Sequence, residues 1–250
     1  MWSSRERTLL VTARMIPQLV RHPVWRVGGP RDGAGQGVLL VPGFGFGDWS
    51  LLPLRSWLAV RGYRPLGTRT GLNLGCTTTL VERIERRLEY LARLTGRRVI
   101  VVGQSRGGWL ARIAAVRRPD LVRGLVMLAS PVLDPLGAHA SGVEFARVLA
   151  RASARGVPGL LDADCLDGDC YRTNRALLRA PLPRPVAAVS VFSRHDTVVP
   201  WPLCQDPCAD CVEVASSHTG MGLDPEVYAL LAERLARWSA DPRPTPFSVR

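Results

Sequence analysis

The chain has 250 residues, of which 46% are hydrophobic, and this is sufficient for one large α/β domain with a buried core. No stretch approaches the roughly 20 consecutive apolar residues of a membrane-spanning helix, and the N-terminus lacks a secretory cleavage pattern. We therefore expect a cytoplasmic protein without a transmembrane segment. The formal net charge is +12, but all 33 basic residues are arginines spread along the whole chain, so the charge does not indicate nucleic-acid binding.

Residues 1–36 are predicted to form a helical extension in front of the main domain. Leu9, Ile16 and Val20 can share one face of a helix, with arginines at seven-residue spacing on another face. A basic amphipathic helix of this kind either packs on the domain or lies on an anionic membrane surface. Because packing is the commoner arrangement and Pro17 interrupts the pattern, we expect packing, with peripheral membrane contact as the alternative.

Short apolar runs alternate with amphipathic stretches along the next part of the chain. Strands are predicted within residues 37–41, 62–70, 97–103, 122–130, 185–193 and 211–216. Helices are predicted over residues 48–61, 77–94 and 106–118, the first of them capped by Asp48. Near-continuous apolar strands that alternate with helices predict an α/β fold, in which helices cover both faces of a mainly parallel sheet.

The helix over residues 77–94 has the clearest pattern. Leu80, Ile84, Leu88 and Leu91 line one face, while charged pairs at i,i+4 spacing occupy the other. Gly96 follows the last periodic residue, as expected for a left-handed C-terminal cap. We therefore expect this helix to bury one face on the sheet and to end at the glycine.

Residues 131–183 interrupt the alternation and are too long for an ordinary connection between strands. They contain helical patches, such as residues 143–154, and we expect them to form a cap over one end of the sheet; we call them the cap segment. Residues 37–130 and 184–240 then form the core of the domain. The remaining residues, 241–250, are a Pro-rich tail that we expect to be loosely ordered.

The stretch "VVGQSRGGWLA" places Ser105 between Gly103 and Gly107, after a buried strand and before a helix. A Gly-x-Ser-x-Gly motif alone is weak evidence, because short motifs occur by chance. In the context of a strand and a helix, it predicts a sharp turn that exposes the serine at the carboxyl end of the sheet. Small residues at both glycine positions allow the strand and the helix to approach closely.

A serine becomes a nucleophile only when a base removes its proton and a third group holds that base. Asp196 and His218 each follow a predicted strand after the serine, so both are expected at the same edge of the sheet. Of the other histidines, His22 precedes the serine and His139 lies in the cap segment. We interpret His195 as a surface or turn residue.

Over residues 37–237 the sequence resembles the α/β-hydrolase superfamily, in particular its lipase and esterase type. The resemblance implies that Ser105 in "GQSRGG" is the nucleophile, Asp196 in "RHDTVVP" the acid and His218 in "SSHTG" the base. The first two strands of the family are difficult to identify in the leading residues, so the sheet is expected to be shorter at that edge.

"VPGFGFGDW" resembles the His-Gly-x-Gly loop with which this family builds part of its oxyanion hole. Pro42 stands where the family usually has histidine. Because such a loop contributes backbone N–H groups, the resemblance implies that the Phe44 and Arg106 N–H groups bind the oxyanion. A Gly-rich turn without a catalytic role is the alternative for this stretch.

These features predict a serine hydrolase that cleaves carboxylic esters through an acyl-enzyme intermediate. No metal and no organic cofactor is expected. Aromatic residues near the motifs favour small-molecule or lipid-like esters, although such residues often belong to the core. The alternatives are an acyltransferase that uses the same triad and an inactive binding protein on the same fold. Neither the substrate-binding residues nor the oligomeric state follows from the sequence.

The six cysteines leave three interpretations open. They are reduced thiols, or they form small-loop disulfides, or they hold a structural zinc ion. The disulfides would join Cys165 to Cys170, and Cys204 to Cys208 or Cys211. The zinc site would combine "CADC" with "CLDGDC", although the second spacing is wider than usual.

Overall fold

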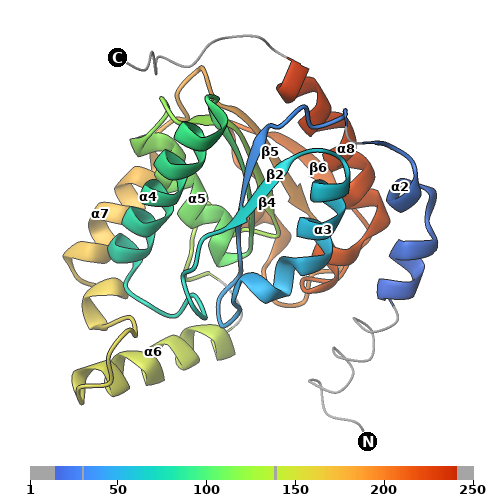
Figure 1. The fold of residues 1–250 in the computed structure, drawn as a ribbon. Helices are drawn as coiled ribbons and strands as arrows, with labels where there is room; N and C mark the ends of the chain where they lie inside the picture. The colour runs from blue at the N-terminus through green and yellow to red at the C-terminus, as the bar shows by residue number, and fades with distance from the viewer. Residues whose placement is uncertain (1–14, 30, 138–139, 241–250) are drawn as a thin grey trace, which may run out of the picture.

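The structure, a computed structural model, describes residues 15–29, 31–137 and 140–240. Its centre is a parallel sheet of six strands in the order β2-β1-β3-β4-β5-β6 (Figure 1). The strands are β1 (Gly37–Val41), β2 (Arg64–Gly67), β3 (Val99–Gln104), β4 (Val122–Leu128), β5 (Ala187–Phe192) and β6 (Asp210–Glu213). Every predicted strand is present, and the predicted α/β fold is confirmed.

Helices cover both faces of this sheet. Figure 1 shows α4, α5 and α7 on one side and α3 and α8 on the other, with α6 below these layers. Their bounds are α2 (Pro23–Arg26), α3 (Leu52–Val60), α4 (Thr77–Thr95), α5 (Arg106–Arg117), α6 (Ala140–Ala154), α7 (Asp169–Arg179) and α8 (Pro225–Ala240). Short 3-10 helices are η1 (Asp48–Leu51), η2 (Ala163–Cys165), η3 (Trp201–Cys204) and η4 (Gly220–Leu223). No helix in the described part of the chain is long and apolar enough to cross a membrane.

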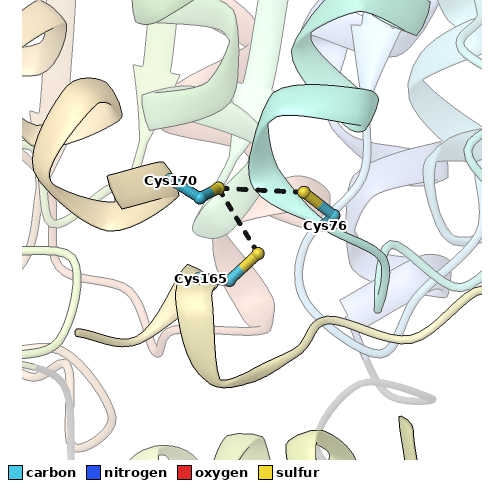
Figure 2. A group of neighbouring side chains, drawn as sticks. All are labelled: Cys76, Cys165 and Cys170. Atoms are coloured by element: carbon cyan, nitrogen blue, oxygen red, sulfur yellow. Dashed lines mark hydrogen bonds between the residues drawn. The ribbon is translucent and has the colours of Figure 1, made fainter. Parts of the chain in front are cut away.

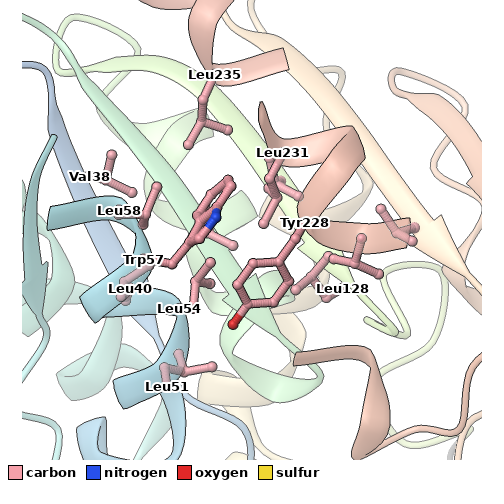
Figure 3. Packing of buried hydrophobic residues seen from close by; sticks show 14 of the residues in the cluster. Val38, Leu40, Leu51, Leu54, Trp57, Leu58, Leu128, Tyr228, Leu231 and Leu235 are labelled. Atoms are coloured by element: carbon pink, nitrogen blue, oxygen red, sulfur yellow. The ribbon is translucent and has the colours of Figure 1, made fainter. Parts of the chain in front are cut away.

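Successive residues of the central strands point to opposite faces of the sheet, and both faces are apolar. On β1, Val38 and Leu40 join the core on one face, and Leu39 and Val41 join the core on the other. This arrangement explains why the strands read as continuous apolar runs. Figure 3 shows the core under α3 and α8.

The helix α4 forms as predicted. Its residues Leu80, Ile84, Leu88 and Leu91 are all buried against the sheet. The helix ends at Gly96, which has a φ of 64° in the left-handed region. The predicted apolar face and the predicted C-terminal cap are therefore both correct.

The prediction that Asp48 caps the helix over residues 48–61 is wrong. The residue at the N-cap of η1 is Gly47, and Asp48 is the first residue of that short helix. Its carboxylate instead accepts hydrogen bonds from the N–H groups of Thr68 (3.2 Å) and Arg69 (3.0 Å), just after β2. These two N–H groups lie just beyond the end of β2 and do not donate to a neighbouring strand. The carboxylate therefore stabilises the backbone where this edge strand ends.

The prediction of which residues form the apolar face of the N-terminal extension is wrong. Leu9 lies outside the described residues, and Ile16 and Val20 are exposed. Leu19 is buried instead, at 1% exposure, in the core under α3 and α8. Next to it, Trp25 contacts the ring of Tyr228 with the two centroids 6.0 Å apart. The described part of the extension therefore packs on the domain through a face that the spacing of Ile16 and Val20 did not predict.

The cap segment contains α6, η2 and α7. Its own small core consists of Ala146, Leu149, Ala150, Leu161 and Cys165. Phe44 and Leu74, which belong to loops at the carboxyl edge of the sheet, pack against this cluster. The cap segment thus meets the sheet on the side where the predicted catalytic residues lie.

Candidate active site

Ser105 occupies a strained turn between β3 and α5. Its backbone has a φ of 52° and a ψ of −122°, in a region that residues other than glycine rarely adopt. The Ser105 N–H donates to the carbonyl of Leu128 at 2.7 Å, which fixes the turn to the end of β4. Strain of this kind persists only where the surroundings enforce it, and it is typical of functional positions. The strand-turn-helix context predicted for Ser105 is present.

The glycines on either side of Ser105 are required by close backbone contacts. A Cβ added at Gly103 would lie 2.5 Å from the carbonyl oxygen of Gly107. A Cβ added at Gly107 would collide with the carbonyl oxygen of Val41. The Gly-x-Ser-x-Gly spacing is thus explained by packing, because any larger residue would separate α5 from β1 and β3.

Ser105, His218 and Asp196 form a continuous hydrogen-bonded chain. The His218 Nε2 atom lies 3.0 Å from the Ser105 Oγ atom, and Nδ1 lies 2.7 Å from the Asp196 Oδ2 atom. A carboxylate only accepts, so Nδ1–H donates to Asp196 and Nε2 is left to accept from the serine. The side chains of His218 and Asp196 are 11% and 2% exposed. The structure therefore brings together the three residues predicted as the triad.

The acid is held by its backbone neighbours. The second carboxylate oxygen of Asp196, Oδ1, accepts from the N–H groups of Val198 and Val199, each at 2.8 Å. Hydrogen bonds from two N–H groups fix the orientation of the carboxylate. His195 is exposed and donates its N–H to the Ser193 Oγ atom, so it lies next to the triad without being a member of it.

Two polar residues that the sequence did not single out position the triad. The Ser193 Oγ atom accepts from the N–H groups of His195 (3.1 Å) and Ser216 (3.3 Å), which joins the loop that carries the acid to the loop that carries the base. The Gln104 Nε2 atom donates to the His218 carbonyl at 3.1 Å. Both residues lie at the carboxyl ends of strands, and this position is the signal that could have identified them.

The loop that contains Phe44 lies against Ser105. A Cβ added at Gly43 would be 3.4 Å from the Ser105 Cβ atom, which is ordinary van der Waals contact. The N–H groups of Phe44 and Arg106, predicted to bind the oxyanion, donate no hydrogen bond to any residue that the structure describes. Their role as oxyanion donors stays a prediction.

The side chain of Arg106 joins the helix that follows Ser105 to the loop between β2 and α4. Its guanidinium donates to the carbonyls of Asn73 (2.8 Å) and Gly75 (2.9 Å). The Asn73 side chain in turn donates from Nδ2 to the Pro42 carbonyl at 2.6 Å. Burial lowers the pKa of the Arg106 guanidinium to about 10, so this residue remains a cation at neutral pH. No sequence motif indicated this role for the Arg106 side chain.

A cavity of about 160 Å³ opens beside Ser105. Its walls come from the core, through Phe44 and Trp109, and from the cap segment, through Val143 and Leu161. These walls are largely apolar, and the polar side chains among them include Ser105, Arg106 and Asn174. A cavity of this composition suits an apolar ligand that carries one polar reacting group.

The cysteines adopt an arrangement that the sequence analysis did not foresee. All six have free thiols, so neither of the disulfide arrangements considered is formed. Cys165 and Cys170 lie beside Cys76, and these three are the one group of three or more metal-ligating side chains within the described residues. The "CADC" and "CLDGDC" segments do not combine into such a group.

A six-stranded parallel sheet with helices on both faces, and with a strained strand-to-helix turn that carries a serine, defines the α/β-hydrolase class of fold. Residues 38–247 match the alpha/beta hydrolase family, and the chain belongs to that family. The predicted resemblance is therefore confirmed over most of the chain.

Solved structures with this fold include esterases and lipases. A metagenomic carboxyl esterase has a TM-score of 0.61 at 17% identity, with 83% of this chain and 76% of that chain covered. A lipase of Bacillus licheniformis has a TM-score of 0.59 at 12% identity, with 81% and 92% covered. A monoacylglycerol lipase of Paleococcus ferrophilus has a TM-score of 0.54 at 18% identity, with 82% and 96% covered. At these identities the likeness shows the fold. No curated protein matches the chain in sequence.

Proposed function

We propose that this protein is a serine hydrolase that cleaves carboxylic esters through an acyl-enzyme intermediate. The observation that carries the proposal is the unbroken chain of hydrogen bonds from Asp196 through His218 to Ser105. A buried carboxylate, a histidine in a fixed tautomer and a serine on a strained turn are the parts that activation of a hydroxyl requires.

His218 accepts and then returns a proton in both half-reactions, while Asp196 stays ionised. His218 Nε2 accepts the Ser105 hydroxyl proton as Oγ attacks the ester carbonyl, and the resulting imidazolium is stabilised by the Asp196 carboxylate. The imidazolium then gives its proton to the leaving alkoxide, which departs as the alcohol. In the second half-reaction His218 takes a proton from water, and the resulting hydroxide attacks the acyl carbonyl. The acid then leaves as the Ser105 Oγ atom takes this proton back from the imidazolium.

The negative charge of the tetrahedral intermediates requires donors beside Ser105. The Phe44 and Arg106 N–H groups are placed on the loop and the helix that flank the serine, and both are without a partner among the described residues. Donors that are fixed before the reaction stabilise developing charge without reorganisation. We assign the oxyanion to these two groups.

The shape and composition of the cavity support an apolar acyl group as the part of the ester that is bound. Phe44, Trp109 and Leu161 line it, and the Ser105 side chain lies at its wall. The structural neighbours named above are called esterases and lipases, and these names agree with an ester as the substrate. Small-molecule or lipid-like esters are therefore the substrate class that we assign to this site.

An active-serine phosphonate probe tests the proposal on the full-length chain. We expect the probe to label the wild-type protein, with the adduct located on Ser105 by peptide mass spectrometry. The His218→Ala variant should lose most of this labelling, because the serine then lacks its base. His195→Ala is the matched control and should label like the wild type.

Two results would contradict the assignment. Absence of labelling in the folded wild-type protein would favour the inactive binding protein. Loss of labelling in His195→Ala, with retention in His218→Ala, would show that His195 and not His218 acts as the base.

A further inference from the structure

Three thiols from distant parts of the chain meet at the edge of the cap segment. Cys76 immediately precedes α4, Cys165 ends η2 and Cys170 lies in the first turn of α7. The Cys170 Sγ atom is 3.7 Å from that of Cys76 and 3.4 Å from that of Cys165, and all three sulfur atoms lie within 4.8 Å of one another (Figure 2). Cys76 and Cys170 are 94 residues apart in sequence.

These separations suit a metal ion shared by the three sulfur atoms. Tetrahedral zinc has Zn–S bonds of about 2.3 Å, which places two sulfur ligands about 3.8 Å apart. The separations of the other two sulfur atoms from Cys170, 3.7 and 3.4 Å, are close to that value. Figure 2 shows the three side chains pointing toward one another from different elements.

Polar groups around Cys170 suit a sulfur atom that carries negative charge. The Thr78 Oγ1 atom lies 3.4 Å from the Cys170 Sγ atom, and the Asn174 Nδ2 atom lies 3.5 Å from it. The same Asn174 amide donates to the Thr78 Oγ1 atom at 2.9 Å and to the Cys170 carbonyl at 2.7 Å, so its longer contact with the sulfur is a shared one. Hydrogen bonds of this kind orient and stabilise metal-bound thiolates.

The charge of Arg106 provides an independent argument. This guanidinium is buried, with 7% of the residue exposed, and no ion pair joins it to a carboxylate of the described residues. Burial lowers the pKa of Arg106, and negative charge on the three cysteines beside it would raise that pKa. A buried cation is costly unless negative charge lies nearby. Three thiolates with one Zn²⁺ carry a net charge of −1, which balances Arg106.

We propose that Cys76, Cys165 and Cys170 bind one Zn²⁺ ion as thiolates, with a solvent molecule as the fourth ligand. Binding converts the three thiols to thiolates and releases their protons to solvent, so no oxidant or reductant takes part. The site is distinct from the zinc arrangement considered in the sequence analysis, because it uses Cys76 and omits the "CADC" cysteines.

The ion would fix the cap segment to the core at the substrate cavity. Cys76 belongs to the core, whereas Cys165 and Cys170 belong to the cap segment. Cys165 also lines the cavity beside Arg106 and Ser105. A metal that joins these elements holds the wall of the cavity in place, and this role does not depend on the proposed esterase activity.

The test is the zinc content of the full-length protein. The chain is purified under reducing, oxygen-free conditions, equilibrated with Zn²⁺, desalted and analysed by mass spectrometry of the metal. We expect about one zinc per chain in the wild type and less than about a tenth of that in Cys170→Ser. Cys208→Ser is the matched control, because Cys208 is an exposed cysteine outside the group, and it should retain the metal.

Co²⁺ provides a second readout that does not require a folded variant. Titration of the metal-free wild type with Co²⁺ should produce a thiolate-to-cobalt charge-transfer band that saturates at about one equivalent. Three results would overturn the proposal: no zinc retained and no such band in the reduced protein, equal zinc in Cys170→Ser, or loss of zinc in Cys208→Ser alone.

Discussion

The turn around Ser105 and the cap segment face the same cavity, but they are built in opposite ways. At the turn, α5 is buried from Arg106 to Ala115, and glycines bring backbone against backbone. In the cap segment, α6 is only partly covered, and its residues Phe145 and Val148 are each 47% exposed. The turn has no room for adjustment, whereas the cap segment rests on a small cluster of side chains.

This difference separates two tasks of the proposed enzyme. A hydroxyl, an imidazole and a carboxylate act together only when their separations are held to a fraction of an ångström. A wall that contacts an apolar acyl group needs only the appropriate shape, and loosely packed elements tolerate change in it. We therefore expect substitutions at the turn to affect chemistry or folding, and substitutions in the cap segment to affect substrate choice.

The largest effect is expected at the nucleophile. Ser105→Ala should reduce the turnover of short p-nitrophenyl esters by at least about 10³-fold, because no other group in the chain replaces the attacking oxygen. The free energy of unfolding should change by less than about 1 kcal/mol, since one hydroxyl is removed and the turn is kept. Steady-state kinetics and thermal unfolding measure the two quantities. Activity near that of the wild type would refute the assignment of Ser105.

The next largest effect concerns the packing of the turn. Gly107→Ala should destabilise the protein by about 3 kcal/mol, because the added methyl group collides with the backbone of β1. The melting temperature of a chain of this size should then fall by roughly 6–12 °C, as calorimetry would measure. An unchanged melting temperature would mean that the turn is as adaptable as the cap segment.

A smaller loss is expected inside the cap segment. Leu149→Ala removes a side chain that is 9% exposed from the cluster around α6, and it should cost about 2 kcal/mol. We expect KM for longer acyl esters to rise more than kcat falls, because the cavity wall moves while the triad stays in place. Val148→Ala on the same helix is the control and should change stability by less than about 0.5 kcal/mol. Equal effects of the two variants would contradict the buried position of Leu149.

The smallest effect repeats the glycine substitution in the other region. Gly142 lies in α6, and within the part of the chain that the structure describes nothing lies within 4 Å of a Cβ added there. Gly142→Ala should therefore stabilise the protein by up to about 1 kcal/mol, because alanine loses less backbone entropy in a helix. The comparison with Gly107→Ala by chemical denaturation should show opposite signs. Destabilisation at both positions would mean that α6 is as tightly packed as α5.

The proximity of Ser105, Asp196 and His218 could be predicted from the sequence because each of them follows a strand of its own. Ser105, Asp196 and His218 come after β3, β5 and β6, and parallel strands end at one edge of the sheet. The carboxyl ends of strands are fixed by the fold class alone, so the order along the chain was sufficient. The buried face of α4 was predictable for a similar reason, since its period is local.

The features that the sequence could not show all depend on contacts between distant segments. Cys76 meets Cys170 only because the cap segment folds back over the start of α4, and no local spacing encodes that contact. Leu19 is buried instead of Ile16 because the docking angle of the N-terminal helix is set by α3 and α8. Asp48 is a residue type that often caps helices, but its carboxylate accepts hydrogen bonds from the N–H groups of Thr68 and Arg69 just after β2.

The hydrogen bonds of Asn73 have a consequence for how this site can change in sequence. Its side chain holds the carbonyl of Pro42, while its own carbonyl receives the guanidinium of Arg106. A substitution in the Phe44 loop and a substitution at Arg106 therefore both act through Asn73. In a double-mutant cycle, their effects on the free energy of unfolding should not add. A substitution in one of these two segments is therefore expected to require a matching substitution in the other. Asn73, which contacts both, determines which combinations keep the hydrogen bonds beside Ser105.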